Sequence, residues 1–366
     1  MRITIILILV AILLLTVAPA VADDSPPLTA DNLDQFASAV QIDFATLENA
    51  DRFDSGWFAL SGDGAYVAVT RRDGGLVIFD SAGGEVAAAY NVTRSSDQPG
   101  TVLDADFGSD NRTLAALHAD GERYYLSLHT IDGDEITVVT LPESPDMPVR
   151  VWLDADGLYA WIEVLAFEGP HYVMRMPLPG ADGDEADIIT LPSGPENDME
   201  AYVRIGRIPA PLAVTASLAG EVKLWNLETG EVTHEVQLDG VPVFGRVNET
   251  SGTQMAWRDP ISDALYLLDF VTGENQQIAD LGGAYIQAIL LSPAADVILG
   301  VAVDDRPVVV AWNAATGELT ELGAYRQCSR VPDLVRLSAD GSTLVIGCDT
   351  GLDVWRVHTG TDNNED

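Results

Sequence analysis

The stretch Asp333–Gly360, which reads DLVRLSADGSTLVIGCDTGLDVWRVHTG, decides the fold. It holds three short apolar runs, DLVRLS, STLVIGC and LDVWRV, with turn signals at Ala339–Ser342 and Asp349–Gly351 between them. Val, Ile, Leu and Trp at alternating positions favour half-buried strands, and Asp-Gly pairs supply the backbone geometry of tight turns. The stretch therefore predicts a three-stranded meander. Because so small a sheet cannot bury its own apolar face, it must pack against other units.

Six earlier parts of the chain repeat this pattern of strand, turn, strand, turn and strand. The repeats span residues 57–90, 103–141, 149–191, 202–238, 243–281 and 285–325. A large apolar residue closes each third strand, and these residues are Phe79, Leu128, Met176, Trp225, Leu268, Trp312 and Trp355. Their spacings are 49, 48, 49, 43, 44 and 43 residues. Seven such units, with no sustained helical periodicity, predict an all-β, seven-bladed β-propeller.

One predicted strand lies outside these repeats. Each blade of a propeller has four antiparallel strands, and the first six units supply a fourth strand, as in Glu231–Leu238. The seventh unit is followed by the polar tail 361–366 instead. We therefore predict that the isolated strand Ala37–Leu47 completes the last blade and closes the ring, because an open ring leaves unpaired edges. The predicted organisation is a flexible lead at residues 23–36 and one propeller domain at 37–360.

Four segments resemble the WD-repeat family of β-propellers: LWNLETGE (Leu224–Glu231), AWNAATGE (Ala311–Glu318), VWRVHTG (Val354–Gly360) and LSADG (Leu337–Gly341). The resemblance spans nearly the whole chain after residue 22, with departures. Asn226 and Asn313 stand where the family has its aspartate, and Arg356 replaces it in the last unit. The Gly-His pair of the family is absent, so its buried His–Asp network is not expected. The resemblance implies a fold and a scaffold role rather than a chemistry.

The chain is strongly acidic, with a net charge of −38 over 366 residues and one lysine, Lys223. Nucleic-acid binding draws on clustered Lys and Arg, and docking on anionic lipid requires basic segments. This charge therefore argues against both kinds of partner.

The N-terminus has the pattern of a secretory signal. Arg2 supplies the positive charge, Ile3–Val17 is an apolar run, and Ala20-Val21-Ala22 is a small-residue cleavage site. We expect cleavage after Ala22 and a secreted or extracytoplasmic protein without a membrane segment in its mature form. The alternative is an uncleaved N-terminal anchor that holds the propeller outside the membrane.

Two cysteines, Cys328 and Cys348, are present in a chain directed to an oxidising compartment. Cys348 ends the second predicted strand of the last blade, and Cys328 lies in the loop that enters this blade. Because both positions fall at the same end of the blade, we predict one disulfide between them.

No motif in the sequence indicates catalysis. The five histidines have no metal-ligand spacing, so we expect them at the surface or at strand ends, and no G-x-S-x-G elbow occurs. The turns Asp132–Glu135 and Asp154–Gly157 offer clustered oxygens for Ca²⁺, but neither continues into a twelve-residue loop ending in glutamate. A tight turn uses Asp-Gly for its own backbone, so we predict no metal at these turns. Because no catalytic or cofactor-binding motif occurs, we also predict no catalytic residue and no cofactor.

The arginines fall on one predicted face of the ring. The loops between second and third strands and between blades share one face, and they hold Arg52 and Arg94 together with the six arginines of the predicted site: Arg71, Arg72, Arg258, Arg306, Arg326 and Arg330. The guanidinium fork suits carboxylates and other anions, so this face is the predicted binding face. The alternative is that these arginines only neutralise neighbouring acids, namely Asp73, Asp259, Asp304 and Asp305.

The sequence thus predicts a secreted, monomeric, non-enzymatic propeller that binds a protein or a small anionic ligand. A propeller enzyme, either a lactonase-like hydrolase or a quinone-dependent dehydrogenase, is the alternative, because the turns LETGE and AATGE also resemble those of quinoprotein propellers. That family continues to a tryptophan where this chain has His234 and Glu321. Seven units rather than eight also favour the non-enzymatic reading.

Overall fold

The structure is a computed structural model, and it describes most of the chain after residue 24. The described residues are 25–47, 53–71, 74–90, 101–121, 123–132, 137–144, 146–154, 156–166, 172–181, 186–191, 202–206, 212–217, 219–239, 253–259, 261–302, 307–325, 334–348 and 350–358, with the backbone alone for 53–57 and 202–206.

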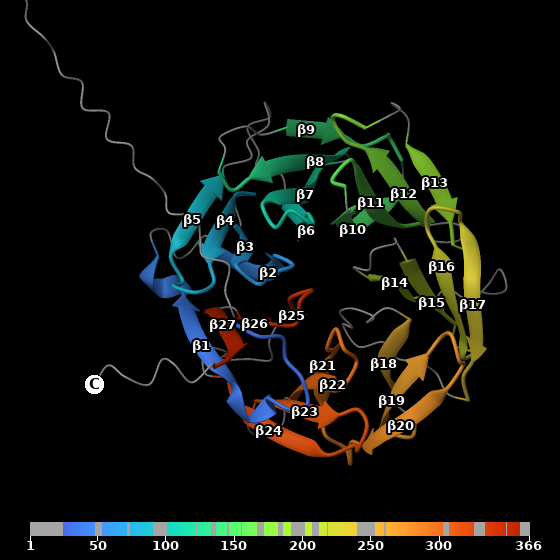
Figure 1. Ribbon diagram of the computed structural model, residues 1–366. Coiled ribbons are helices and arrows are strands. Elements are labelled where there is room, and N and C mark those ends of the chain that lie inside the picture. Colours follow the sequence, from blue (N-terminus) through green and yellow to red (C-terminus); the bar gives the residue numbers. More distant parts are fainter. Residues whose placement is uncertain are drawn as a thin grey trace, which may run out of the picture.

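Within these residues, seven antiparallel sheets stand in a ring, as Figure 1 shows, so the predicted all-β, seven-bladed propeller is confirmed. We call the strands of a blade a to d from the centre outward. Blade 1 holds β2 (Phe53–Leu60), β3 (Tyr66–Arg71), β4 (Leu76–Asp80) and β5 (Val86–Tyr90), and blade 2 holds β6 (Thr101–Phe107), β7 (Thr113–Asp120), β8 (Arg123–Thr130) and β9 (Thr137–Thr140). Blade 3 holds β10 (Met147–Leu153), β11 (Tyr159–Leu165), β12 (Tyr172–Pro177) and β13 (Asp187–Thr190), and blade 4 holds β14 (Tyr202–Gly206), β15 (Leu212–Ala216), β16 (Glu221–Asn226) and β17 (Glu231–Gln237).

The remaining blades complete the ring. Blade 5 holds β18 (Gln254–Asp259), β19 (Ala264–Asp269) and β20 (Asn275–Asp280), and its expected strand a lies outside the described residues. Blade 6 holds β21 (Ile286–Leu291), β22 (Val297–Ala302), β23 (Val308–Asn313) and β24 (Leu319–Ala324). Blade 7 holds β25 (Leu334–Leu337), β26 (Thr343–Cys348), β27 (Gly351–Val357) and, as its strand d, β1 (Phe36–Asp43).

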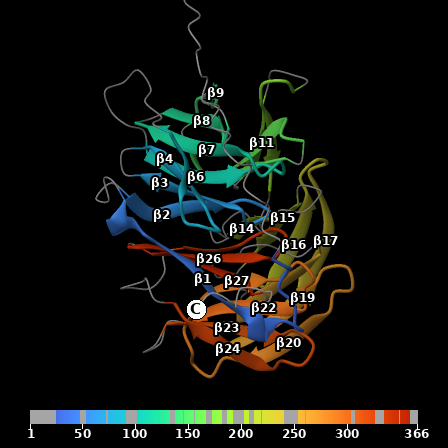
Figure 2. The ribbon, with the colours of Figure 1, turned by 60° about the vertical axis from the view of Figure 1, so that its left-hand side comes forward.

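The N-terminal strand β1 closes the ring, as predicted. It pairs with β27 in a register that runs from Phe36 opposite Val357 to Asp43 opposite Gly351, and Figure 2 shows it alongside the last strands of the chain. The strand is shorter than the predicted range 37–47. After Asp43 the chain turns into the 3₁₀ helix η2 (Phe44–Thr46), because the Asp43 carboxylate accepts the amide of Ala45 at 2.8 Å and caps this turn.

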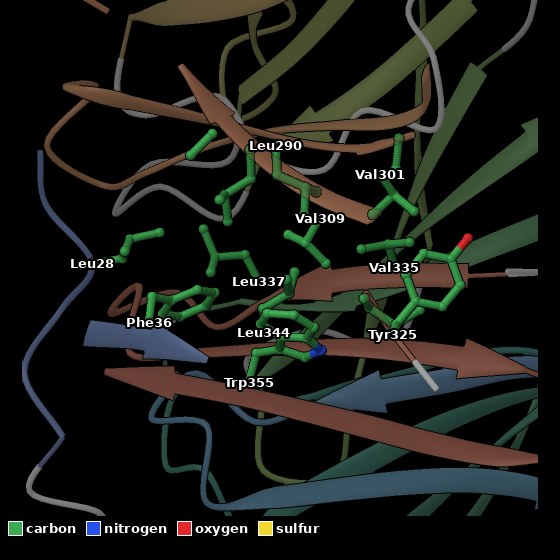
Figure 3. Packing of buried hydrophobic residues seen from close by; sticks show 14 of the residues in the cluster. Leu28, Phe36, Leu290, Val301, Val309, Tyr325, Val335, Leu337, Leu344 and Trp355 are labelled. Carbon is green, nitrogen blue, oxygen red and sulfur yellow. The ribbon is translucent and has the colours of Figure 1, made fainter. Parts of the chain in front are cut away.

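Residues 25–35, which the sequence analysis assigns to a flexible lead, pack against the ring. Leu28 is 0% exposed and joins the core between blades 6 and 7, as Figure 3 shows. Its amide donates to the Gly341 carbonyl at 2.9 Å, and the Ala30 amide donates to Asp296 at 3.0 Å. The segment, which ends in the 3₁₀ helix η1 (Leu33–Gln35) before β1, therefore ties the a–b turns of these two blades together.

The side chain of Arg356 links blade 7 to blade 1. It stands at the position of the WD-repeat aspartate, yet it is 7% exposed and its Nη2 donates to Ser81 Oγ at 2.7 Å and to the Gly64 carbonyl at 3.4 Å. The departure from the family pattern thus supplies a contact across the closing junction.

The side chains of Asn226 and Asn313 stabilise the c–d turns of their blades. The side-chain oxygen of Asn226 accepts the amides of residues 228 and 229 at 2.8 and 3.2 Å, and Asn313 accepts those of 315 and 316 at 2.9 and 3.0 Å. Asp80 and Asp269 bind their c–d turns in the same way. Because a neutral amide oxygen accepts these bonds as a carboxylate does, the turn keeps its shape with either residue.

A pair of histidines lies buried between blades 1 and 2. The sequence analysis expects histidines at the surface or at strand ends; these two are not at the surface, although His129 is next to the last residue of β8. His118 and His129 are both 0% exposed, and their Nε2 atoms lie 2.7 and 2.8 Å from Ser127 Oγ. The rings of Tyr125 and His118 are stacked with their centroids 4.7 Å apart, and the ring centroids of Tyr90 in blade 1 and His129 are 4.6 Å apart. Both faces of a propeller blade pack against neighbours, so a polar residue that alternates with Leu or Ala is not necessarily exposed.

Burial keeps both imidazoles neutral. It lowers the pKa of His118 to about 3, with a further lowering by the nearby His129, and burial lowers the pKa of His129 to about 4. A hydroxyl has one hydrogen and two lone pairs, so Ser127 can pair with the Nε2 atoms of both neutral rings, whereas their buried Nδ1 atoms have no hydrogen-bond partner among the described residues. The unfolded chain binds protons on these histidines below about pH 6.5, whereas the folded chain does not. Stability is therefore full above pH 6.5 and falls as the pH drops toward 4.

We predict that replacing both histidines by glutamine flattens this dependence. In the parent protein the free energy of unfolding falls between pH 6.5 and 5, by up to about 1.4 kcal/mol per pH unit for each histidine. Urea unfolding at several pH values in this window measures the slope, and few carboxylates titrate there. The control is His358→Gln, because His358 is exposed and its loss should leave the slope unchanged. An equal slope in the parent and in the double variant would contradict the assignment.

Candidate functional site

The strand order gives the ring two chemically different faces. Because neighbouring strands are antiparallel, the a–b and c–d turns lie on one face, and the b–c turns and the segments between blades lie on the other. We call the first the acidic face, after Asp63, Asp110, Asp154 and Asp340 in its a–b turns. The second is the arginine-bearing face, on which Arg71 ends β3 and Arg258 lies near the end of β18.

The aspartates of the acidic face are used by their own turns. Asp63 accepts the amide of Ala65 at 3.0 Å, and Asp340 accepts that of Ser342 at 2.9 Å. Asp154 likewise accepts the amides of residues 158 and 159 at 2.8 and 3.1 Å. Around Asp110, burial alone would raise the carboxyl pKa, but hydrogen bonds from Thr113 and Arg112 hold this pKa below its usual value. These carboxylates therefore stabilise turns, as Asp-Gly turns require.

The described part of the chain offers no metal centre: within it, no group of three or more His, Cys, Asp or Glu side chains could hold an ion. Asp154 contributes to its turn as described above, and the turn Asp132–Glu135 lies mostly outside the described residues.

Two of the six predicted site arginines are described, and the ring does not bring them together. Arg71 belongs to blade 1 and Arg258 to blade 5, with blades 6 and 7 between them on the shorter path. Arg71 has an interaction partner of its own. The other four, Arg72, Arg306, Arg326 and Arg330, lie outside the described residues.

Arg258 is paired with an acid next to it. Its Nη2 bonds to Asp263, whose second oxygen accepts the amide of Gly283, and these bonds lower the pKa of the Asp263 carboxyl. The alternative of local neutralisation names Asp259 for this role, but Asp259 instead accepts the amides of Ile261 and Ser262 at 3.0 and 3.1 Å. Arg258 thus has a carboxylate partner already.

The predicted disulfide can be placed at one end only. Cys348 is the last residue of β26 and is 1% exposed, whereas Cys328 lies outside the described residues.

A second group of charges lies on the innermost strands, and the sequence analysis does not identify it. Asp104 on β6 is 4% exposed and accepts the amide of Val151 on β10 at 3.0 Å. Burial raises the pKa of this carboxyl, whereas Arg336 on β25 and Arg150 on β10 lower it. The Nε atom of Arg150 also lies 3.8 Å from Oε2 of Glu163. The charges of blades 2, 3 and 7 thus interact near the axis of the ring. In sequence they lie far apart, so only the closed ring makes them neighbours.

Among the cavities lined by described residues are the following two. One, of about 250 Å³, lies where blade 2 meets blade 3 and includes Arg123 and Glu143 in its lining. The other, of about 240 Å³, lies between η1 and the outer hairpin of blade 6 and includes Leu33 and Asn313. Arg123 begins β8 directly after a b–c turn, so the first cavity opens on the arginine-bearing face. Residue 123 is absent from the predicted site because a single arginine at a strand start has no distinctive pattern.

Comparison with known proteins shows the fold. No protein-family model and no curated protein matches the sequence. Among solved structures 1540 chains match, so likeness of fold alone does not select a function. One of them is the β-propeller domain of Cps50 (Swd1) from Myceliophteria thermophila, with a TM-score of 0.59 and 14% identity. The match covers 87% of this chain and 100% of that one. The chain is therefore a seven-bladed β-propeller that is structurally similar to a WD-repeat propeller at low sequence identity.

Proposed function

We propose that this propeller is a secreted, non-enzymatic scaffold that binds a protein or a small anionic ligand through its arginine-bearing face. A ring of rigid blades that presents loops on a shared face is suited to binding rather than to one defined reaction. The scaffold architecture is that of a WD-like propeller. The identity of the binding face rests on the distribution of charge.

The observation that carries the proposal is the contrast between the two faces. On the acidic face, the carboxylates accept hydrogen bonds from the amides of their own turns, as Asp63, Asp154 and Asp340 do. On the other face, strand polarity puts Arg71 and Arg258 at the same end of their blades. In a chain of net charge −38, arginines on one face of the ring favour an anionic ligand there, and the four predicted arginines that lie outside the described residues are the ones proposed to hold it.

We predict that capture of a partner depends on this face. The protein is immobilised and exposed to the extracellular fluid of its source, and bound material is released by a salt gradient. Arg326→Gln together with Arg330→Gln should reduce retention of the bound component by at least about tenfold, because each arginine supplies charge-assisted hydrogen bonds. The matched control is Arg112→Gln, since Arg112 pairs with Asp132 on the acidic face and should not affect retention. Equal retention by the double variant and the parent would refute the proposed face.

We also propose export with removal of residues 1–22 and a disulfide between Cys328 and Cys348. The signal pattern at the N-terminus supports export. As a separate finding, no helix among the described residues is long and apolar enough to cross a membrane. The near-complete burial of Cys348, together with the lack of a free cysteine among the described residues, supports the bond.

One mass measurement tests both points. Protein from the medium is denatured and alkylated without reduction, and its intact mass is recorded. We predict the mass of a chain that begins at Asp23, with no alkyl group before reduction and two after it. A retained N-terminal segment would contradict cleavage, and two alkyl groups before reduction would contradict the disulfide.

A further inference from the structure

The cavity beside the segment that leads out of blade 2 has two charges of opposite sign among the described residues of its lining. Arg123 stands at the start of β8, and Glu143 lies in the segment that leads from β9 to β10. Both side chains are exposed. Neither makes an ion pair, with the other or with any other group, and neither side chain forms a hydrogen bond in the part of the chain that the structure describes.

Arg123 is exceptional among the basic side chains that the structure describes. The others have partners, which are Asp132 for Arg112, Glu163 for Arg150, the Tyr159 ring for Arg175, Glu221 for Lys223, Asp263 for Arg258 and Ser81 for Arg356. Arg71 and Arg336 also have partners. With 57 acidic residues against 19 basic ones, a carboxylate partner for Arg123 would be easy to supply. Arg123 instead lines the cavity together with Glu143.

The segment that carries Glu143 is fixed by hydrogen bonds on both sides of this residue. The Leu141 amide donates to the Tyr124 carbonyl at 3.0 Å, which extends the ladder between β8 and β9. Ser144 Oγ accepts the Asp146 amide at 3.1 Å and lies 3.3 Å from the Tyr172 hydroxyl of blade 3. Because these bonds hold both ends of the lining segment 141–144, the cavity is largely preformed, which reduces the entropy that a ligand loses on binding.

The rest of the described lining combines apolar side chains with the hydroxyl groups of Thr140 and Ser144. Leu141 is 6% exposed, and Tyr124 and Pro142 add a ring each. A volume of about 250 Å³ is below the usual range for drug-sized ligands, so the occupant is small. A ligand that satisfies this lining carries a negative group for Arg123, a positive group for Glu143 and an apolar portion for the floor.

We infer that this cavity binds a free α-amino acid with an apolar side chain, whose carboxylate bonds to Arg123 and whose ammonium bonds to Glu143. A simple dicarboxylate fits less well, because Glu143 repels a second negative charge. A peptide fits less well, because one residue of a chain does not carry both charges. This site is separate from the six predicted arginines, so the scaffold proposal does not depend on it.

The test is a calorimetric titration of the full-length protein with three related probes. L-leucine carries both charges, N-acetyl-L-leucine lacks the ammonium group, and L-leucinamide lacks the carboxylate. The parent should bind L-leucine saturably and should bind each of the other two at least about tenfold more weakly, since each loses one charge-assisted contact. Arg123→Gln should weaken L-leucine binding at least about tenfold.

Glu143→Gln gives the most specific readout. It should weaken L-leucine binding while it strengthens N-acetyl-L-leucine binding several-fold, because it removes a repulsive carboxylate; a mere loss of structure cannot produce this reversal. Arg112→Gln, in the same blade on the acidic face, should bind as the parent does. The inference is overturned if L-leucine shows no saturable binding, or if Arg123→Gln and Glu143→Gln bind it as the parent does. In either case retention on the Arg326 and Arg330 variant still decides the scaffold proposal separately.

Discussion

The pairing of β1 with β27 is the constraint on which the rest of the molecule depends. A blade has two apolar faces. Both faces are buried only when the blade has a neighbouring blade on each side. The pairing joins residues near the two ends of the chain, Phe36 and Val357, and so gives blade 7 its fourth strand. Arg356, on the same strand β27, then reaches Ser81 in blade 1. Backbone pairing and a buried side chain therefore act at the same junction.

The N-terminal segment extends this closure beyond one strand. Leu28 fills the core between blades 6 and 7, and the amide of Ala30 binds Asp296 in blade 6. The first described residues thus contact blades 6 and 7, which are the last two blades in the sequence. Because these contacts span most of the chain, they form only after a large loop has closed, which is entropically costly and slows folding.

The architecture was predictable from the sequence, whereas the site chemistry was predictable only in part. Period, strand alternation and turn residues identify seven blades and assign the closing strand, because these are local signals that repeat. The same alternation misplaces His118 and His129, since both faces of a blade are buried and a polar residue there is not marked as interior. The link between Asp104 and Arg336, and the cavity shared by Arg123 and Glu143, arise from segments that only the fold brings together. Of the predicted arginines, Arg258 is already paired with Asp263, which the sequence could not specify because several acids lie nearby.

Hydrogen exchange of the full-length protein tests the closed ring most directly. If β1 is an integral strand of blade 7, its amides that pair with β27 should exchange with protection within about tenfold of that of β26, because they open only when the blade does. Residues 40–42 lie in the paired register, and those whose amides point toward β27 report on this directly, because successive amides of an edge strand point to opposite sides. Exchange of these amides at the rate of an unstructured chain, while β26 stays protected, would contradict closure by the N-terminal strand.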